Sequence, residues 1–73
     1  MVLKNNLKAV RCQKGLTQEE LADLVGVSRQ TIISIERYKY KPSLELGLKL
    51  SLTLDIKIEG LFYFEKNCKN QFN

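Results

Sequence analysis

Apolar side chains return every three or four residues along most of the first half of the chain. Glycines at positions 15 and 26 interrupt this pattern, and each is followed two residues later by a Thr or Ser that can cap a helix. The period is typical of amphipathic helices that bury one face. It predicts three helices, over residues 7–14, 18–25 and 28–37, with N-caps at Asn6, Thr17 and Ser28.

The sequence TQEE, residues 17–20, marks the start of the second of these helices. Thr17 and Glu20 have the spacing of a capping box, in which each side chain accepts a hydrogen bond from the other residue's backbone N–H. Acidic residues in the first turn also suit the positive end of the helix dipole. At the other end Gly26 can adopt a left-handed conformation at little steric cost. We therefore expect a tight turn between the second and third helices.

Leucine occupies every second position from residue 44 to residue 54, which is the period of a β-strand. We nevertheless favour a helix, because leucines four residues apart form i, i+4 pairs and Ser43 supplies an N-cap. Leucine is also a stronger helix former than strand former. A strand remains the alternative for this segment. Asp55 tolerates the turn that would end the helix.

A fifth, shorter helix is predicted over residues 58–64, where Gly60 weakens it. The chain shows no repeat and no linker-like run, and its length supports a single domain. We therefore expect an all-α fold, a compact five-helix domain over residues 1–64. A polar C-terminal tail follows over residues 65–73.

The third predicted helix has two chemically different faces when its residues are placed at about 100° intervals. Ile32 and Ile35 fall on one side, so they should pack inward. The opposite side is polar except for Ile33, which should be exposed; the polar residues on this side are Arg29, Gln30, Ser34 and Arg37.

The preceding helix supplies the matching apolar surface. Leu21, Leu24 and Val25 form its apolar stripe, Ala22 is small enough for two helices to cross closely, and Val27 can fill the corner after the turn. Two helices joined by a glycine turn, with a polar outward face on the second, predict a helix-turn-helix.

The segment GLTQEELADLVGVSRQTIISIERYKYKPSLELGLKLSLTL resembles the lambda-repressor-like family of Cro and phage-repressor type, also called the XRE family. The similarity covers residues 4–62, where small, apolar, glycine and polar positions agree in order. It implies a five-helix domain whose third helix enters the major groove of double-stranded DNA, usually as a homodimer on a two-fold related operator.

The resemblance also implies roles for individual residues. The positions that typically meet base edges are Arg29, Gln30 and Ser34. The positions that would contact the phosphate backbone lie at the starts of the second and third helices and after the third: Gln18, Ser28, Thr31, Arg37, Lys39, Tyr40 and Lys41. Arg11 and Glu36 match a pair that forms a structural salt bridge in relatives. Ile33, in the middle of this face, is a candidate for contact with a thymine methyl group.

The chain departs from the family pattern at the end of the third helix. Relatives commonly have Asn-Gly after the glutamate, whereas Arg37 and Tyr38 stand there in this chain. The helix must therefore turn without glycine, or it must run longer.

The segment after the fourth helix is more apolar than a 73-residue monomer can easily cover. We therefore expect part of it to be buried between two subunits. The candidate dimer residues are Ile58, Leu61, Phe62 and Phe64.

The formal net charge of +4 suits a polyanionic partner without proving one. The chain has no histidine and only two cysteines, without a CxxC spacing, which excludes a zinc site and argues against a disulfide framework. We expect Cys12 to be a small core residue and Cys68 an exposed tail thiol. The sequence has no segment as long as a membrane span and no signal-peptide pattern. We therefore expect a cytoplasmic protein with no metal, cofactor, membrane or small-molecule ligand.

These features favour a sequence-specific DNA-binding transcriptional regulator, most simply a small repressor that acts as a homodimer. The alternative is an antitoxin or other protein-binding module whose C-terminal region binds a partner protein, and the two functions are compatible. An enzyme is not indicated, because the sequence offers no histidine, no glycine-rich phosphate loop and no activated nucleophile.

Overall fold

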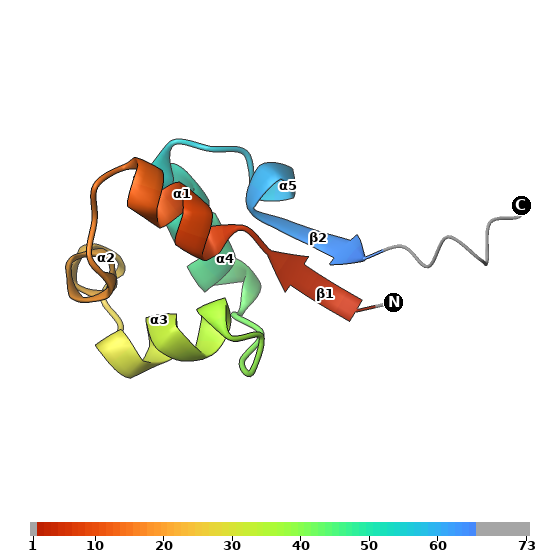
Figure 1. The fold of residues 1–73 in the computed structure, drawn as a ribbon, viewed down its shortest axis with the longest axis horizontal. Helices are drawn as coiled ribbons and strands as arrows, with labels where there is room; N and C mark the ends of the chain where they lie inside the picture. Colours follow the sequence, from red (N-terminus) through yellow and green to blue (C-terminus); the bar gives the residue numbers. More distant parts are fainter. Residues whose placement is uncertain (1, 66–73) are drawn as a thin grey trace, which may run out of the picture.

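A computed structural model describes residues 2–65, which form five helices and one two-stranded sheet (Figure 1). In chain order the elements are β1 (Val2–Asn5), α1 (Leu7–Gln13), α2 (Gln18–Val25), α3 (Arg29–Glu36), α4 (Leu44–Leu54), α5 (Ile58–Leu61) and β2 (Phe62–Glu65). Helices α2 and α3 lie at one end of the domain, and the sheet projects from the other (Figure 1). The leucine-rich segment is a helix, as predicted, and the strand alternative is wrong.

The expectation of an all-α fold is corrected by the sheet. Strand β1 pairs with β2 in antiparallel register, so that Val2 lies opposite Glu65 and Asn5 lies opposite Phe62. The predicted fifth helix therefore ends at Leu61, and the aromatic residues after it are extended. Aromatic residues favour strands, and the backbone of β1 supplies the hydrogen-bonding partner that makes this conformation stable. Of the expected polar tail, Glu65 belongs to β2; residues 66–73, including Cys68, lie outside the described residues.

The hydrophobic core is built from all five helices. Its fully or almost fully buried apolar residues are Leu7, Val10, Leu21, Ala22, Val25, Ile32, Ile35, Leu46, Leu50, Leu54 and Leu61. Val27 packs against this cluster at the corner between α2 and α3, as predicted. Among the described residues, no helix is long and apolar enough to cross a membrane.

Two residues predicted to be buried are on the surface. Leu24 is 60% exposed, because the buried face of α2 is formed by Leu21, Ala22 and Val25 and Leu24 lies about 100° from its centre. Cys12 is also exposed. The buried face of α1 consists of Leu7, Val10 and Arg11, and Cys12 lies on the opposite side.

The helix starts follow the predicted caps with one exception. The Thr17 hydroxyl accepts from the Glu20 N–H at 3.0 Å, and the Glu20 carboxylate accepts from the Thr17 N–H at 2.8 Å, which completes the capping box. Ser28 and Ser43 cap α3 and α4. Gly26 has φ 77°, in the left-handed region, and ends α2.

The exception is the first helix, where Asn6 was the predicted cap. The Asn6 amide nitrogen instead donates to the Gly60 carbonyl oxygen at 3.0 Å. The side-chain oxygen of the preceding Asn5 accepts from the Leu7 N–H at 3.0 Å. Asn6 is therefore the N-cap residue by position, as predicted, but its side chain makes no capping hydrogen bond. Asn5 supplies a side-chain acceptor to the first turn instead, because the Asn6 side chain bonds to α5.

Candidate nucleic-acid interface

Helix α3 is fixed to the domain by one face and presents the other to solvent. Ile32 and Ile35 are completely buried, as predicted. On the opposite side Arg29 and Gln30 are exposed. The side-chain amide of Gln30 donates to the Ser34 hydroxyl at 3.3 Å, which links two predicted base-contact residues one turn apart.

The apolar residue on this face is less exposed than the sequence suggested. Ile33 is half-buried, and so is Ser34. Ile33 therefore presents only part of its surface outward, although it lies in the middle of the outward face.

The start of α3 carries two of the predicted phosphate-contact residues. Ser28 is exposed and Thr31 is half-buried. Their hydroxyl oxygens lie 2.9 Å apart, and the Ser28 hydroxyl also accepts from the Thr31 N–H at 3.1 Å. Each hydroxyl can make more than one hydrogen bond, so both keep capacity for an outside partner.

Arg29 and Gln18 line the same shallow groove between α3 and the start of α2. The other residues along it come from α1, the turn before α2 and the first turn of α2: Arg11, Gly15, Leu16, Thr17 and Glu19. A predicted base-contact residue and a predicted phosphate-contact residue therefore lie on one continuous surface.

Beneath this surface Arg11 and Glu36 form an ion pair, with Arg11 Nε 2.7 Å from Glu36 Oε2. The two side chains are only 9% and 4% exposed. The Gln18 amide donates to Glu36 Oε1 at 3.0 Å, and Arg11 Nη1 donates to the Leu16 carbonyl at 2.8 Å. The hydrogen bond to Glu36 raises the pKa of Arg11, while burial acts in the opposite direction.

This network joins three helices through fully paired charged groups. Glu36 at the end of α3 is bonded to Arg11 of α1 and Gln18 of α2. Gln18 thus has a structural partner in addition to the phosphate contact that the resemblance implies. A buried carboxylate with two donors holds the end of α3 in one position relative to α1 and α2.

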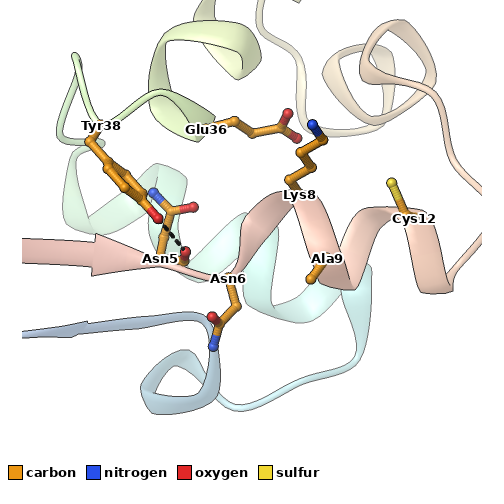
Figure 2. A pocket seen from close by; sticks show the side chains of 7 residues that line it. All are labelled: Asn5, Asn6, Lys8, Ala9, Cys12, Glu36 and Tyr38. Atoms are coloured by element: carbon orange, nitrogen blue, oxygen red, sulfur yellow. Dashed lines mark hydrogen bonds between the residues drawn. The ribbon is translucent and has the colours of Figure 1, made fainter.

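The chain leaves α3 without a glycine. Arg37 is the C-cap, and Tyr38 follows with φ 62°. This is the left-handed region, which residues other than glycine rarely adopt. The Tyr38 hydroxyl donates to the Asn5 carbonyl at 3.4 Å (Figure 2). Lys4 Nζ lies 5.0 Å from the centre of the tyrosine ring. These contacts with β1 stabilise the turn. The sequence left two possibilities for the end of this helix, a turn without glycine or a longer helix. The structure shows the turn without glycine.

The predicted phosphate-contact residues after α3 are all on the surface. Arg37, Lys39, Tyr40 and Lys41 are exposed. The backbone N–H of Lys39 donates to the Ser34 carbonyl at 2.9 Å, which folds the loop back against the end of the helix. Cationic side chains therefore lie next to the C-terminal end of α3, at the opposite end from Ser28.

An open pocket lies beside this turn (Figure 2). Its lining comes from β1, α1 and the end of α3: Asn5, Asn6, Lys8, Ala9, Cys12, Glu36 and Tyr38. Lys8 from α1 and Glu36 from α3 extend toward each other in it (Figure 2). Asn5 and Lys4, which contact the end of α3 and Tyr38, were not predicted to do so, because the four-residue strand β1 leaves no clear periodicity in the sequence.

The candidate dimer residues differ in how far they are exposed to solvent. Leu61 is completely buried in the core, so its inclusion was wrong: the short helix α5 turns this side chain inward. Ile58 and Phe62 are half-buried next to Gly47 of α4. Phe64 in β2 is 57% exposed.

Two helices joined by a left-handed glycine, with arginine and glutamine on the outer face of the second, define a helix-turn-helix protein. The chain belongs to the helix-turn-helix family HTH_3, which matches residues 7–61. The family and the fold agree with the resemblance seen in the sequence.

Known relatives cover most of the chain. It is 52% identical over 63 residues to an uncharacterized HTH-type transcriptional regulator of Methanocaldococcus jannaschii, covering 86% of this chain and 96% of that protein. It is 33% identical over 71 residues to the immunity repressor protein of Bacillus phage phi105, covering 97% of this chain and 49% of that protein. The crystal structure of the restriction-modification controller protein C.AhdI from Aeromonas hydrophila is similar, with a TM-score of 0.70 and 41% identity. That match covers 74% of this chain and 78% of that one.

Proposed function

We propose that this protein is a sequence-specific transcriptional regulator that reads the major groove of double-stranded DNA with α3. The observation that carries the proposal is the division of α3 into two faces: Ile32 and Ile35 are fully buried, while Arg29 and Gln30 are exposed opposite them. Membership of HTH_3 and relatives named as transcriptional regulators support the same function.

The chemistry of the outer face fits base recognition. Arginine can donate two hydrogen bonds to guanine O6 and N7, and glutamine can bond adenine N6 and N7 in the same bidentate way. The hydrogen bond between Gln30 and Ser34 holds the amide on this face, ready for an adenine. We assign base contacts to Arg29, Gln30 and Ser34, with Ile33 contacting a thymine methyl group.

Phosphate contacts would flank these residues on both sides. Gln18, Ser28 and Thr31 lie at the N-terminal ends of α2 and α3, where free N–H groups also favour an anion. At the other end are Arg37, Lys39, Tyr40 and Lys41. Backbone contacts on two sides fix the register of α3 while the residues between them read the sequence.

The regulatory effect we propose is repression by a homodimer. Two copies would occupy half-sites about 34 Å apart, one helical turn of DNA, and would block access to the promoter. The similarity to a phage immunity repressor supports repression. The partly exposed apolar side chains of Ile58, Phe62 and Phe64 support a role for this segment in the dimer.

The experiment compares three substitutions of cationic residues on an operator selected from random DNA. Arg29→Ala should cost about 1–3 kcal/mol and relax specificity at one base pair. Lys41→Ala should weaken binding to all sequences alike and reduce the slope of log K against log salt by about 1. Lys57→Ala removes an equal charge from the N-cap of α5 and serves as the control. Arg29→Ala and Lys57→Ala behaving alike would contradict the proposed reading mode.

A second candidate function, an antitoxin or protein-binding module, is favoured by β2. Tyr63 and Phe64 are 41% and 57% exposed on a strand that leads into the C-terminal residues. Such a module could also bind DNA. Purification of the tagged chain with the product of its neighbouring gene tests this function, because a stoichiometric complex would form only if a partner is recognised.

A further inference from the structure

Helix α4 has a second apolar face that the core does not use. Leu44, Leu48 and Leu52 are 74%, 46% and 81% exposed, whereas Leu46, Leu50 and Leu54 are buried. Residues four apart lie one above another on a helix, so the three exposed leucines form a single stripe. A helix that is apolar on two faces has the second one available for a partner.

Apolar residues from other elements extend this stripe on both sides. Leu24 of α2, which is 60% exposed, lines a shallow groove together with Leu52 and Thr53. On the other side of the stripe, a Cβ atom at Gly47 would lie 3.5 Å from Ile58 and 3.8 Å from Phe62. The α4 surface, as we name the stripe of Leu44, Leu48 and Leu52, is therefore part of a wider apolar area.

One edge of the α4 surface carries a charge of each sign. Lys49 Nζ lies 3.5 Å from Glu45 Oε2, and the two side chains are 53% and 80% exposed. When two such helices pack antiparallel, Glu45 of each copy can approach Lys49 of the other. The edge is thus electrostatically complementary to itself, as a two-fold symmetric interface requires.

We propose that the α4 surface is the site where a second copy of this chain docks, with the two α4 helices antiparallel. The two-fold axis passes near Leu48, so Leu48 meets Leu48 of the second copy and Leu44 meets Leu52. Leu44 of the second copy then lies beside Leu24 at the groove. This inference rests on the homodimer of the proposed function and adds α4 to its contact surface, beside Ile58 and Phe62.

Two features favour a second copy over a different protein as the occupant. The three leucines are evenly spaced about the middle one, so the stripe matches its own image under a two-fold rotation. Glu45 and Lys49 at its edge are also brought next to each other's counterparts by this rotation. The base-contact residues of α3 are not part of the α4 surface, so both copies keep them free for DNA.

The first experiment is sedimentation of the full chain across micromolar concentrations without DNA. The native chain should dimerise, and Leu48→Glu should raise the dissociation constant at least about 100-fold, because it buries two like charges at the axis. Gln13→Glu is the control, since Gln13 is exposed on α1 and belongs neither to the α4 surface nor to the groove beside it, and it should leave the dissociation constant nearly unchanged. Circular dichroism of Leu48→Glu checks that the monomer stays helical.

A charge exchange tests the edge separately. Glu45→Lys alone places like charges across the interface and should weaken the dimer, whereas Glu45→Lys combined with Lys49→Glu should restore it. Restoration is not expected from a surface that meets an unrelated partner, because only a second copy carries the reversed charges.

A cysteine cross-link then locates the axis. In a Cys12→Ser, Cys68→Ser background, Leu48→Cys should form an intermolecular disulfide on mild oxidation, and Thr53→Cys should not. A chain that stays monomeric at all these concentrations, or a dimer that survives Leu48→Glu, overturns the inference. If the Arg29→Ala effect on DNA is present in that case, the DNA-reading function stands and only the docking surface fails.

Discussion

The side-chain amide of Asn5 donates a hydrogen bond to the carbonyl oxygen of Ile35, 2.9 Å away and thirty residues later in the chain. The oxygen of the same amide accepts from the Leu7 N–H. One residue therefore joins the end of β1, the start of α1 and the end of α3. This helps to hold α3 where the short strand meets the helical domain.

We predict that Asn5→Asp lowers stability by about 1–3 kcal/mol, because a carboxylate cannot donate to Ile35 and instead faces its carbonyl oxygen. The cap on Leu7 can persist, since the carboxylate still accepts. Operator affinity should fall more than affinity for random DNA, because the end of α3 is released. Asn6→Asp, which removes only the exposed bond to Gly60, is the control. An equal ratio of specific to non-specific binding in the two variants would argue against a positioning role.

Replacing only one member of the buried Arg11–Glu36 pair should lower the free energy of unfolding substantially. Arg11→Met or Glu36→Leu alone leaves an uncompensated charge in the interior, and each should cost about 3–5 kcal/mol in urea unfolding. The double variant should be less destabilised than the sum of the two, because neither charge remains. Additive losses would mean that the two side chains contribute independently.

Tyr38 should tolerate glycine better than alanine. Both substitutions remove the ring that contacts Lys4 and Asn5, but only glycine relieves the left-handed backbone, which costs about 1–2 kcal/mol for other residues. Tyr38→Gly should therefore be about 1 kcal/mol more stable than Tyr38→Ala. At Tyr40, which is not among the positive-φ residues, the same comparison should show no advantage for glycine. The thermal unfolding of these four variants provides the test.

Ile33 should read a thymine methyl group. Ile33→Ala should weaken binding to the selected operator, and replacing the contacted thymine by uracil should weaken the native protein similarly. With Ile33→Ala, the uracil operator should bind as well as the thymine operator. If Ile33→Ala still lost as much affinity on the uracil operator as the native protein does, Ile33 would not be the residue that contacts the methyl group.

The sequence was informative where local chemistry decides structure. The Thr17–Glu20 capping box, the left-handed Gly26 and the inward faces of Ile32 and Ile35 were all predictable, because each depends on residues within one helical turn. The resemblance to relatives added Arg11 and Glu36, whose side chains are twenty-five residues apart and meet only in the fold.

What the sequence could not indicate depends on long-range pairing. Strand β1 has four residues, and its partner β2 lies about sixty residues away, so no local pattern announces the sheet. In α4, leucines cover most of the circumference, so periodicity alone does not tell the buried set from the exposed Leu44, Leu48 and Leu52. The misplacement of Leu24 and Cys12 has the same origin: a seven- or eight-residue helix contains too few apolar positions to fix its phase.

The most direct test of base reading by α3 is a double-mutant cycle between Arg29 and one guanine of the selected operator. The guanine is replaced by 7-deazaguanine, which lacks the N7 acceptor, and affinities are measured for native and Arg29→Ala protein on both DNAs at one salt concentration. If Arg29 contacts guanine N7, the coupling energy should be about 1–3 kcal/mol, and the base change should have little effect once Arg29 is absent. Additive effects at every guanine of the operator would contradict this contact.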